Sequence, residues 1–139
     1  MIKILLLLSF ALFFILAVPY YSGDIKNHLV WAQSMIDQGL FGFYEREFHD
    51  YAFPNYPPVA MILFALSLKF YYFCLDAILG LNNVISIFPS KLVFFIQWEN
   101  TKIAFLKLPA IFAAVGISYL FLRIGNFFTQ NSKKNKILA

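Results

Sequence analysis

The residue types that could do chemistry gather in one polar stretch, from Gly23 to Val59, which follows an apolar N-terminal run. It holds five of the seven acidic residues and both histidines. Asp24 comes first, and its carboxylate could take a proton from a hydroxyl group as a general base. His28 follows one helical turn later, where it could hydrogen-bond Asp24. Asp is also a preferred helix N-cap, so a purely structural role for Asp24 stays open.

Other polar side chains give weaker signals. Four acidic and imidazole residues lie close together in the second half of the stretch: Glu45, Glu47, His49 and Asp50. Their spacing fixes no ligand geometry for a divalent cation, so we expect a solvated loop, predict no cofactor and leave a metal requirement open. The single cysteine, Cys74, excludes an internal disulfide framework and a Cys-based metal cluster. Four basic residues could contact a lipid phosphate or simply reach lipid headgroups: Lys26, Arg46, Lys69 and Lys107.

The composition places these residues in a membrane protein. Of the 139 residues, 61% are hydrophobic and 13% are charged, whereas a soluble domain is about half apolar and about a quarter charged. The 20% of aromatic residues suits side chains at a membrane interface. The formal net charge of +4 does not indicate nucleic-acid binding, because the lysines form no recognisable motif. We therefore predict an integral, multi-pass membrane protein.

Two helices are predicted before and within the polar stretch. Lys3 followed by the apolar run Ile4–Val18 predicts a first membrane span within residues 1–21, with Lys3 in the cytoplasm. A cleaved signal peptide would look similar, but the bulky residues after the run offer no convincing cleavage site. Residues 24–38 predict an amphipathic helix that Gly39 ends.

Residues 57–81 and 106–128 predict two further helices. Pro57 and Pro58 suit the start of the first one. If that helix crossed the membrane, Lys69 would lie roughly 16 Å deep, at a cost of about 2.5–3.5 kcal/mol. We therefore expect a tilted, re-entrant or interfacial helix there. Residues 106–128 form the cleanest apolar run and predict a span of roughly 34 Å.

The charge distribution favours two crossings over three. Residues 21–105 carry five bases and seven acids, a net charge of −2, whereas residues 106–139 carry five bases and no acid. With two crossings, Lys3 and the basic tail lie in the cytoplasm, as the positive-inside rule prefers, although Lys102 and Lys107 then lie outside. We predict an all-α membrane protein in four segments: a first span (1–21), an extracytoplasmic loop with juxtamembrane or re-entrant helices (22–105), a second span (106–128) and a cytoplasmic tail (129–139). The alternative is three transmembrane helices.

Four motifs occur in the order found at the start of one enzyme fold. They are Gly23-Asp24 after the first apolar run, Trp31-Ala32, Tyr56-Pro57-Pro58 near the end of the loop, and Lys107-Leu108-Pro109 opening the last span. In these motifs the chain resembles the membrane-embedded GT-C glycosyltransferases. The resemblance is greatest to the dolichyl-phosphate-glucose glucosyltransferases and their bacterial mannosyltransferase-like relatives, and it covers nearly the whole chain. In that group the Tyr-Pro-Pro helix is juxtamembrane, which agrees with two crossings.

The resemblance implies transfer of a sugar from a polyprenyl-phosphate donor to a hydroxyl acceptor on the outer face of a bacterial or archaeal cell membrane. It implies that Asp24 is the catalytic base. It also implies substrate contacts for six further residues: His28, Trp31, Tyr56, Pro57, Pro58 and Lys107. The expected partners are the lipid-linked sugar and membrane lipid.

The family has many more membrane helices than the two or three predicted here, and Ile137-Leu138-Ala139 looks like the start of another. We therefore expect an N-terminal fragment, whose missing C-terminal helices complete the enzyme, and we expect the chain alone to be inactive. The alternative hypothesis is a small non-enzymatic accessory protein whose loop docks a partner.

Overall fold

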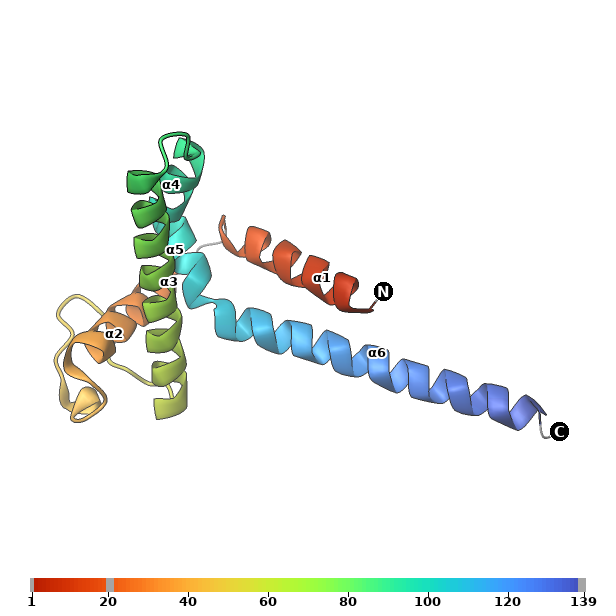
Figure 1. Cartoon of the computed structure of the whole chain (residues 1–139). Helices are drawn as coiled ribbons and strands as arrows, with labels where there is room; N and C mark the ends of the chain where they lie inside the picture. Colours follow the sequence, from red (N-terminus) through yellow and green to blue (C-terminus); the bar gives the residue numbers. More distant parts are fainter. Residues whose placement is uncertain (1, 20–21, 138–139) are drawn as a thin grey trace.

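Every regular element in the described part of the chain is helical (Figure 1). The computed structural model describes residues 2–19 and 22–137, with side chains up to Phe128. These ranges contain six α-helices and one 3-10 helix, without a strand: α1 (Ile2–Ala17), α2 (Ile25–Gln38), η1 (Phe43–Glu45), α3 (Pro58–Val84), α4 (Ser90–Gln97), α5 (Glu99–Leu106) and α6 (Leu108–Ile137). The predicted all-α class is confirmed for these residues.

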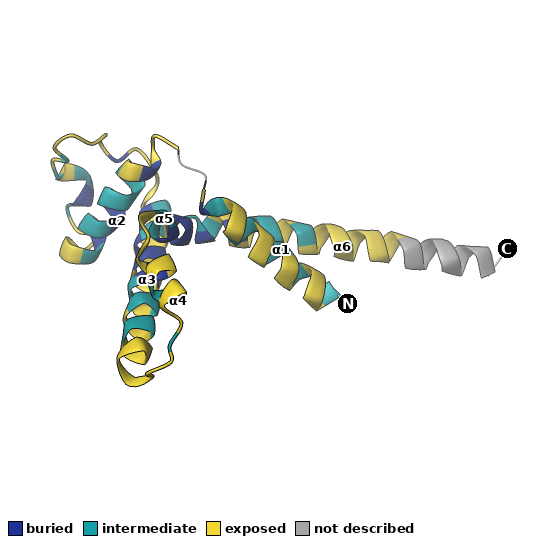
Figure 2. Cartoon of the chain, turned by 90° about the horizontal axis from the view of Figure 1, so that it is seen from above, coloured by how far each residue is buried: buried dark blue, intermediate teal, exposed yellow. Residues whose placement is uncertain are grey.

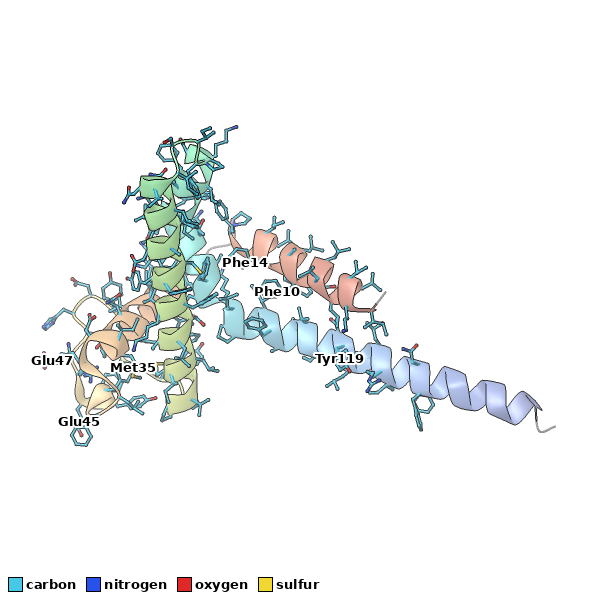
Figure 3. The ribbon with its side chains drawn as sticks, viewed as in Figure 1. Phe10, Phe14, Met35, Glu45, Glu47 and Tyr119 are labelled. Atoms are coloured by element: carbon cyan, nitrogen blue, oxygen red, sulfur yellow. The ribbon has the colours of Figure 1, made fainter. Side chains whose placement is uncertain are left out.

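The helices α1 and α6 form an antiparallel pair that extends away from the other helices (Figure 1). Phe10 points from α1 toward α6 (Figure 3), where its ring centroid lies 5.3 Å from that of Phe112, and the Phe14 ring lies 5.4 Å from that of Phe105 in α5. At the other end of the pair, Ile2 lines a hollow together with Phe127. No residue of α1 is buried, and most of its leucines and isoleucines form an exposed apolar surface (Figure 2).

The long helix α3 runs across the α1–α6 pair instead of beside it in both views (Figures 1 and 2). Ile25 and Ala32 of α2 share one buried cluster with Leu68 of α3. Tyr71 of α3 packs against Phe105 of α5, with ring centroids 5.4 Å apart. The buried core therefore lies where α2, α3 and α5 meet, next to the first turn of α6.

The helix boundaries agree with the sequence in part. The helix predicted at 24–38 is confirmed as α2, and Gly39 follows it with a φ of 75°, a backbone conformation that favours glycine. The tail predicted at 129–139 continues α6 as a helix to Ile137. Residues 20, 21, 138 and 139 of the predicted segments lie outside the described residues.

Two described helices are long and apolar enough to cross a membrane: α3 and the Leu108–Phe128 part of α6. The second agrees with the span predicted at 106–128, although α6 begins two residues later because Lys107 ends α5. The predicted first span is the helix α1, but its 16 residues extend about 24 Å, less than a hydrocarbon core of about 30 Å. The helix expected at 57–81 is one unbroken helix of 27 residues, longer than the prediction.

Candidate functional site

Asp24 lies at the start of α2 with its carboxylate exposed. Its backbone angles are already helical, with φ −74° and ψ −18°, whereas an N-cap residue is typically extended. Its carbonyl oxygen accepts a hydrogen bond of 3.1 Å from the His28 amide, but its side chain makes no capping hydrogen bond. The carboxylate is thus not used as a helix cap.

His28 lies among three aromatic rings that come from three parts of the chain. Its ring stacks on Phe64 of α3, with centroids 4.7 Å apart and an interplanar angle of 17°. The edge-on Tyr56 ring of the loop lies 5.0 Å away, and the Trp31 ring of α2 lies 5.4 Å away. Three of the predicted site residues therefore meet, and Phe64 joins them without having been predicted.

The surroundings of His28 favour its neutral form. Burial lowers the pKa of the imidazole below its usual 6.5, and the nearby Asp24 carboxylate opposes this only in part. Its Nε2 atom is buried and has no hydrogen-bond partner among the described residues. A neutral imidazole can donate or accept one hydrogen bond at this atom, but the atom is closed to solvent in this structure.

Trp31 and Tyr56 differ in how accessible their rings are to a ligand. Trp31 is only 2% exposed, and its Nε1 donates a hydrogen bond of 2.9 Å to the Ala52 carbonyl oxygen. Asn27 Oδ1 accepts a hydrogen bond from the Ala52 amide at 3.2 Å, so two side chains of α2 hold the loop at this residue. Tyr56 is 40% exposed, and its carbonyl oxygen accepts a 2.6 Å hydrogen bond from the Tyr44 hydroxyl. Trp31 therefore has a structural role, while the Tyr56 ring is accessible to a ligand.

Pro57 and Pro58 begin α3. Pro57 has an extended conformation with ψ 152°, and Pro58 occupies the first turn, where its missing N–H costs nothing. Both side chains are exposed. They start the helix so that Phe64, less than two turns later, lies against His28. The structure thus gives the two prolines a positioning role at the site.

Lys107 lies between α5 and α6, at the C-terminal end of α1. Its Nζ donates a hydrogen bond of 2.8 Å to the carbonyl oxygen of Ala17, the last residue of α1. A cation at a helix C-terminus is favourable, because the last carbonyl groups carry partial negative charge. Lys107 therefore joins the end of α1 to the start of α6, and a contact with a lipid phosphate stays a prediction.

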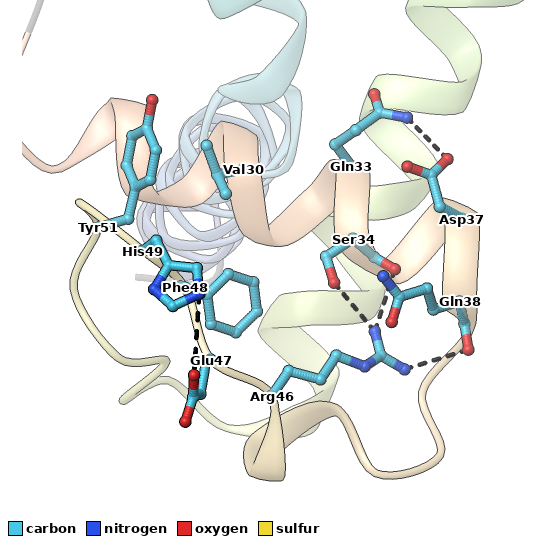
Figure 4. A pocket seen from close by; sticks show the side chains of 10 residues that line it. All are labelled: Val30, Gln33, Ser34, Asp37, Gln38, Arg46, Glu47, Phe48, His49 and Tyr51. Carbon is cyan, nitrogen blue, oxygen red and sulfur yellow. Dashed lines mark hydrogen bonds and ion pairs between the residues drawn. The ribbon is translucent and has the colours of Figure 1, made fainter.

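Arg46 has a role that the sequence did not reveal. Its guanidinium donates hydrogen bonds to the carbonyl oxygens of Ser34, Gln38, Gly39 and Phe41 and to the Ser34 hydroxyl, at 2.7 to 3.1 Å. It thereby satisfies carbonyl groups at the C-terminal end of α2 (Figure 4). The donors of Arg46 are committed to the protein, which argues against the lipid-phosphate contact considered for it.

An open hollow of about 600 Å³ lies on another face of α2 (Figure 4). Val30, Gln33 and Asp37 line it, and helical spacing separates these residues from Asp24 and His28. Glu47 and His49 also line it as an exposed pair 3.8 Å apart. No group of three or more metal-ligating residues occurs within the described ranges.

An apolar groove of about 380 Å³ lies between α3 and α6. Leu63 and Phe70 line it from α3, and Pro109 and Phe112 line it from α6. Leu63 adjoins Phe64, so this groove and the His28 cluster use neighbouring positions of the same helix.

The chain matches no protein-family model, no curated protein and no solved structure. The resemblance to GT-C glycosyltransferases therefore depends on the ordered motifs alone. The structure places the first three of them around His28 and the fourth at the base of the α1–α6 pair.

Proposed function

We propose that this chain forms the first part of a membrane glycosyltransferase of the GT-C type, which transfers a sugar from a polyprenyl phosphate to a hydroxyl group. The observation that carries the proposal is the Asp24 carboxylate. It is exposed, caps no helix, follows the apolar α1 and lies one turn from a partly buried His28. These features suit a base at a membrane surface.

The arrangement of the helices supports a bilayer around α1 and α6. Membrane helices tilt by at most about 40° from the normal, so α3, which runs across the pair, does not cross the same bilayer with them. The exposed positions of α3 include Lys69 and Asp76, whereas the exposed positions of α1 include only one charged residue, Lys3 at its start. We place α1 and α6 across the membrane and α3 along its outer surface.

The proposed reaction inverts the configuration of the sugar. The acceptor oxygen attacks the anomeric carbon while the bond from that carbon to the phosphate oxygen breaks. The phosphate keeps the electron pair of the broken bond, and Asp24 takes the proton of the acceptor hydroxyl. For His28 to orient the acceptor, the rings that cover its Nε2 must move aside. The groove between α3 and α6 takes part of the polyprenyl chain.

The reaction also needs a site that encloses the lipid-linked sugar donor. Asp24 is exposed in the described part of the chain, and the outer surfaces of α1 and α6 are apolar. Further membrane helices packed on these surfaces would exclude water from the site.

The test compares the intact protein that contains this chain with the purified 139 residues. Membranes with the intact protein should transfer labelled sugar from a polyprenyl phosphate to a hydroxyl acceptor, and the 139 residues alone should not. The proposal is wrong if the intact protein leaves every labelled polyprenyl-phosphate sugar unchanged. Turnover by the isolated chain would overturn the need for further helices.

One observation favours the second function, a non-enzymatic accessory protein. Phe41 is 98% exposed at a turn that Gly39 and Gly42 form with positive φ angles and that Arg46 fixes to α2. Phenylalanine is enriched at the cores of protein–protein interfaces, so a partner could bind this ring. Loss of a partner from detergent extracts of the Phe41→Ala variant, with transferase activity absent throughout, would support this function.

A further inference from the structure

Two neighbouring hollows lie beside the C-terminal end of α1, near the C-terminal end of α3. The first, about 300 Å³, lies between the last turns of α1 and α4 and is lined by apolar side chains that include Ile15 and Val18. The second, about 610 Å³, is lined by Lys91, Phe94 and Gln97 of α4. Phe95 and Trp98 line both, so the two hollows form one continuous surface.

The surface changes from apolar to polar along its length. Lys91 and Phe95, at i and i+4, share one side of α4, and Trp98 at i+7, the residue after the helix, continues this side. Ile96, on the opposite side of α4, is buried in the core, and the Tyr71 hydroxyl donates a 3.0 Å hydrogen bond to its carbonyl oxygen. This attachment turns the Lys91 side of α4 away from the core.

The apolar part has the orientation of a lipid chain. With α1 across the bilayer, as proposed above, a lipid acyl chain beside Ile15 and Val18 would run parallel to α1, near the outer surface of the membrane. Trp98 is 51% exposed, and tryptophan is enriched at the level of lipid headgroups. Lys91 and Gln97 then lie at the same level and offer a positive charge and an amide.

We infer that this surface binds one phospholipid with an anionic headgroup. Its acyl chain lies in the hollow between α1 and α4, and its headgroup contacts Lys91 and Gln97. The inference rests on the proposed placement of α1 across the membrane. The site is separate from the one around Asp24, because α4 follows the C-terminal end of α3 and His28 packs near its N-terminal half (Figure 1).

The test uses quenching of tryptophan fluorescence by brominated lipids in nanodiscs. The chain has two tryptophans, and Trp31 is buried and bonded to the loop, so Trp98 is the one that lipid can reach. The difference between the wild-type signal and that of a Trp98→Phe variant isolates Trp98. Brominated phosphatidylglycerol and brominated phosphatidylcholine are compared at equal, low mole fractions.

We expect phosphatidylglycerol to associate with the Trp98 site about fivefold more strongly than phosphatidylcholine, the factor that one lysine near an anionic surface provides. Lys91→Gln should bring the ratio close to one. Lys69→Gln removes the same charge from an exposed residue that lines neither hollow, so it should leave the preference unchanged.

Three results would overturn the inference in different ways. Equal quenching by both lipids in the wild type would leave α1 in the membrane but without a selective lipid site. An equal loss of preference in the Lys91 and Lys69 variants would mean that net charge, and not this surface, attracts the lipid. Quenching by neither lipid would show that Trp98 does not face lipid, for example because a second copy of the protein covers this surface. That result would also count against the proposed membrane placement.

Discussion

Asp24 and His28 have opposite surroundings although one turn of α2 separates them. The carboxylate of Asp24 is exposed and caps nothing, while the imidazole of His28 is packed against Phe64 and Tyr56. General-base catalysis uses such pairs, in which a carboxylate like that of Asp24 takes a proton and a neutral group like His28 forms a hydrogen bond.

The Asp24→Asn change, made in the intact protein, tests the catalytic role proposed for Asp24. Asparagine keeps the size and polarity of the side chain but does not take the acceptor proton, so the rate should fall by about 10²–10⁴-fold. Initial rates are compared at equal amounts of detergent-stable protein. Asp37→Asn is the matched control, since Asp37 is exposed near the other end of α2 and should lose little activity. A rate for Asp24→Asn within a few-fold of the control would leave Asp24 without a catalytic role.

The packing of His28 predicts a dependence of stability on pH. Burial lowers the pKa of His28 in the folded protein, so below its usual pKa of 6.5 the unfolded chain binds more protons than the folded one. The free energy of unfolding should therefore be highest above about pH 6.5 and should fall as the pH drops through 6.5 toward the folded pKa.

Chemical unfolding in detergent at several pH values measures this effect. A His28→Phe variant should lose the part of the pH dependence that His28 causes, because phenylalanine keeps a ring against Phe64 but does not titrate. A His49→Gln variant should keep it, since His49 is highly exposed. Identical pH profiles for the wild type and His28→Phe would contradict the prediction.

Among the elements, the loop after α2 depends on contacts that are distant in the sequence. Trp31 and Asn27 both bind Ala52, more than twenty residues away, and Arg46 binds the end of α2. The Phe41 to Tyr56 segment has some hydrogen bonds of its own, such as Glu45 to Gly42 and Tyr51 to Phe48, and the anchors to Ala52 and Arg46 hold it against α2.

Arg46→Gln should loosen this loop. The guanidinium serves five acceptors, and hydrogen bonds to a charged group contribute about 1.5–3 kcal/mol each at most, so we expect a loss of more than about 1.5 kcal/mol in unfolding free energy. Protease cleavage between residues 40 and 56 should become faster. Lys69→Gln, which removes one exposed positive charge elsewhere, is the control. Unchanged cleavage in Arg46→Gln would mean that Trp31 and Asn27 hold the loop alone.

Local patterns were sufficient for α2 and for the start of α3, but not for the bounds of the short helices α4 and α5 or for the site. The amphipathic period and Gly39 predicted α2, and the paired prolines predicted the start of α3, because these signals act within a few residues. The stacking of Phe64 on His28 and the binding of Arg46 to α2 join residues of different elements. The spacing of residues in the sequence predicts neither contact, since both depend on how α2, the loop and α3 pack.

For the whole molecule, the proposed membrane placement depends on which helices cross the bilayer. By length and composition α3 qualifies and α1 falls short, yet α3 runs across the α1–α6 pair. In a bilayer around α1 and α6, α1 must cross a hydrocarbon core of about 30 Å with a length of about 24 Å. Local thinning of the bilayer can accommodate this difference at a modest cost. A bilayer around α3 would instead place the α1–α6 pair in the plane of the membrane, level with the middle of α3 (Figure 1).

Cysteine labelling in intact cells distinguishes two crossings, by α1 and α6, from three crossings, by α1, α3 and α6. With Cys74 replaced, a membrane-impermeant reagent should label a cysteine at Gln38, in the exposed end of α2, from the outside. A cysteine at Asn135 should react only after the membrane is made permeable, because two crossings return the chain to the side of Lys3. Detection of both cysteines in denatured protein controls for expression. Labelling of Asn135 from outside would mean that α3 crosses as well, and Lys69 would then lie within the bilayer at the cost that made us place α3 on the surface.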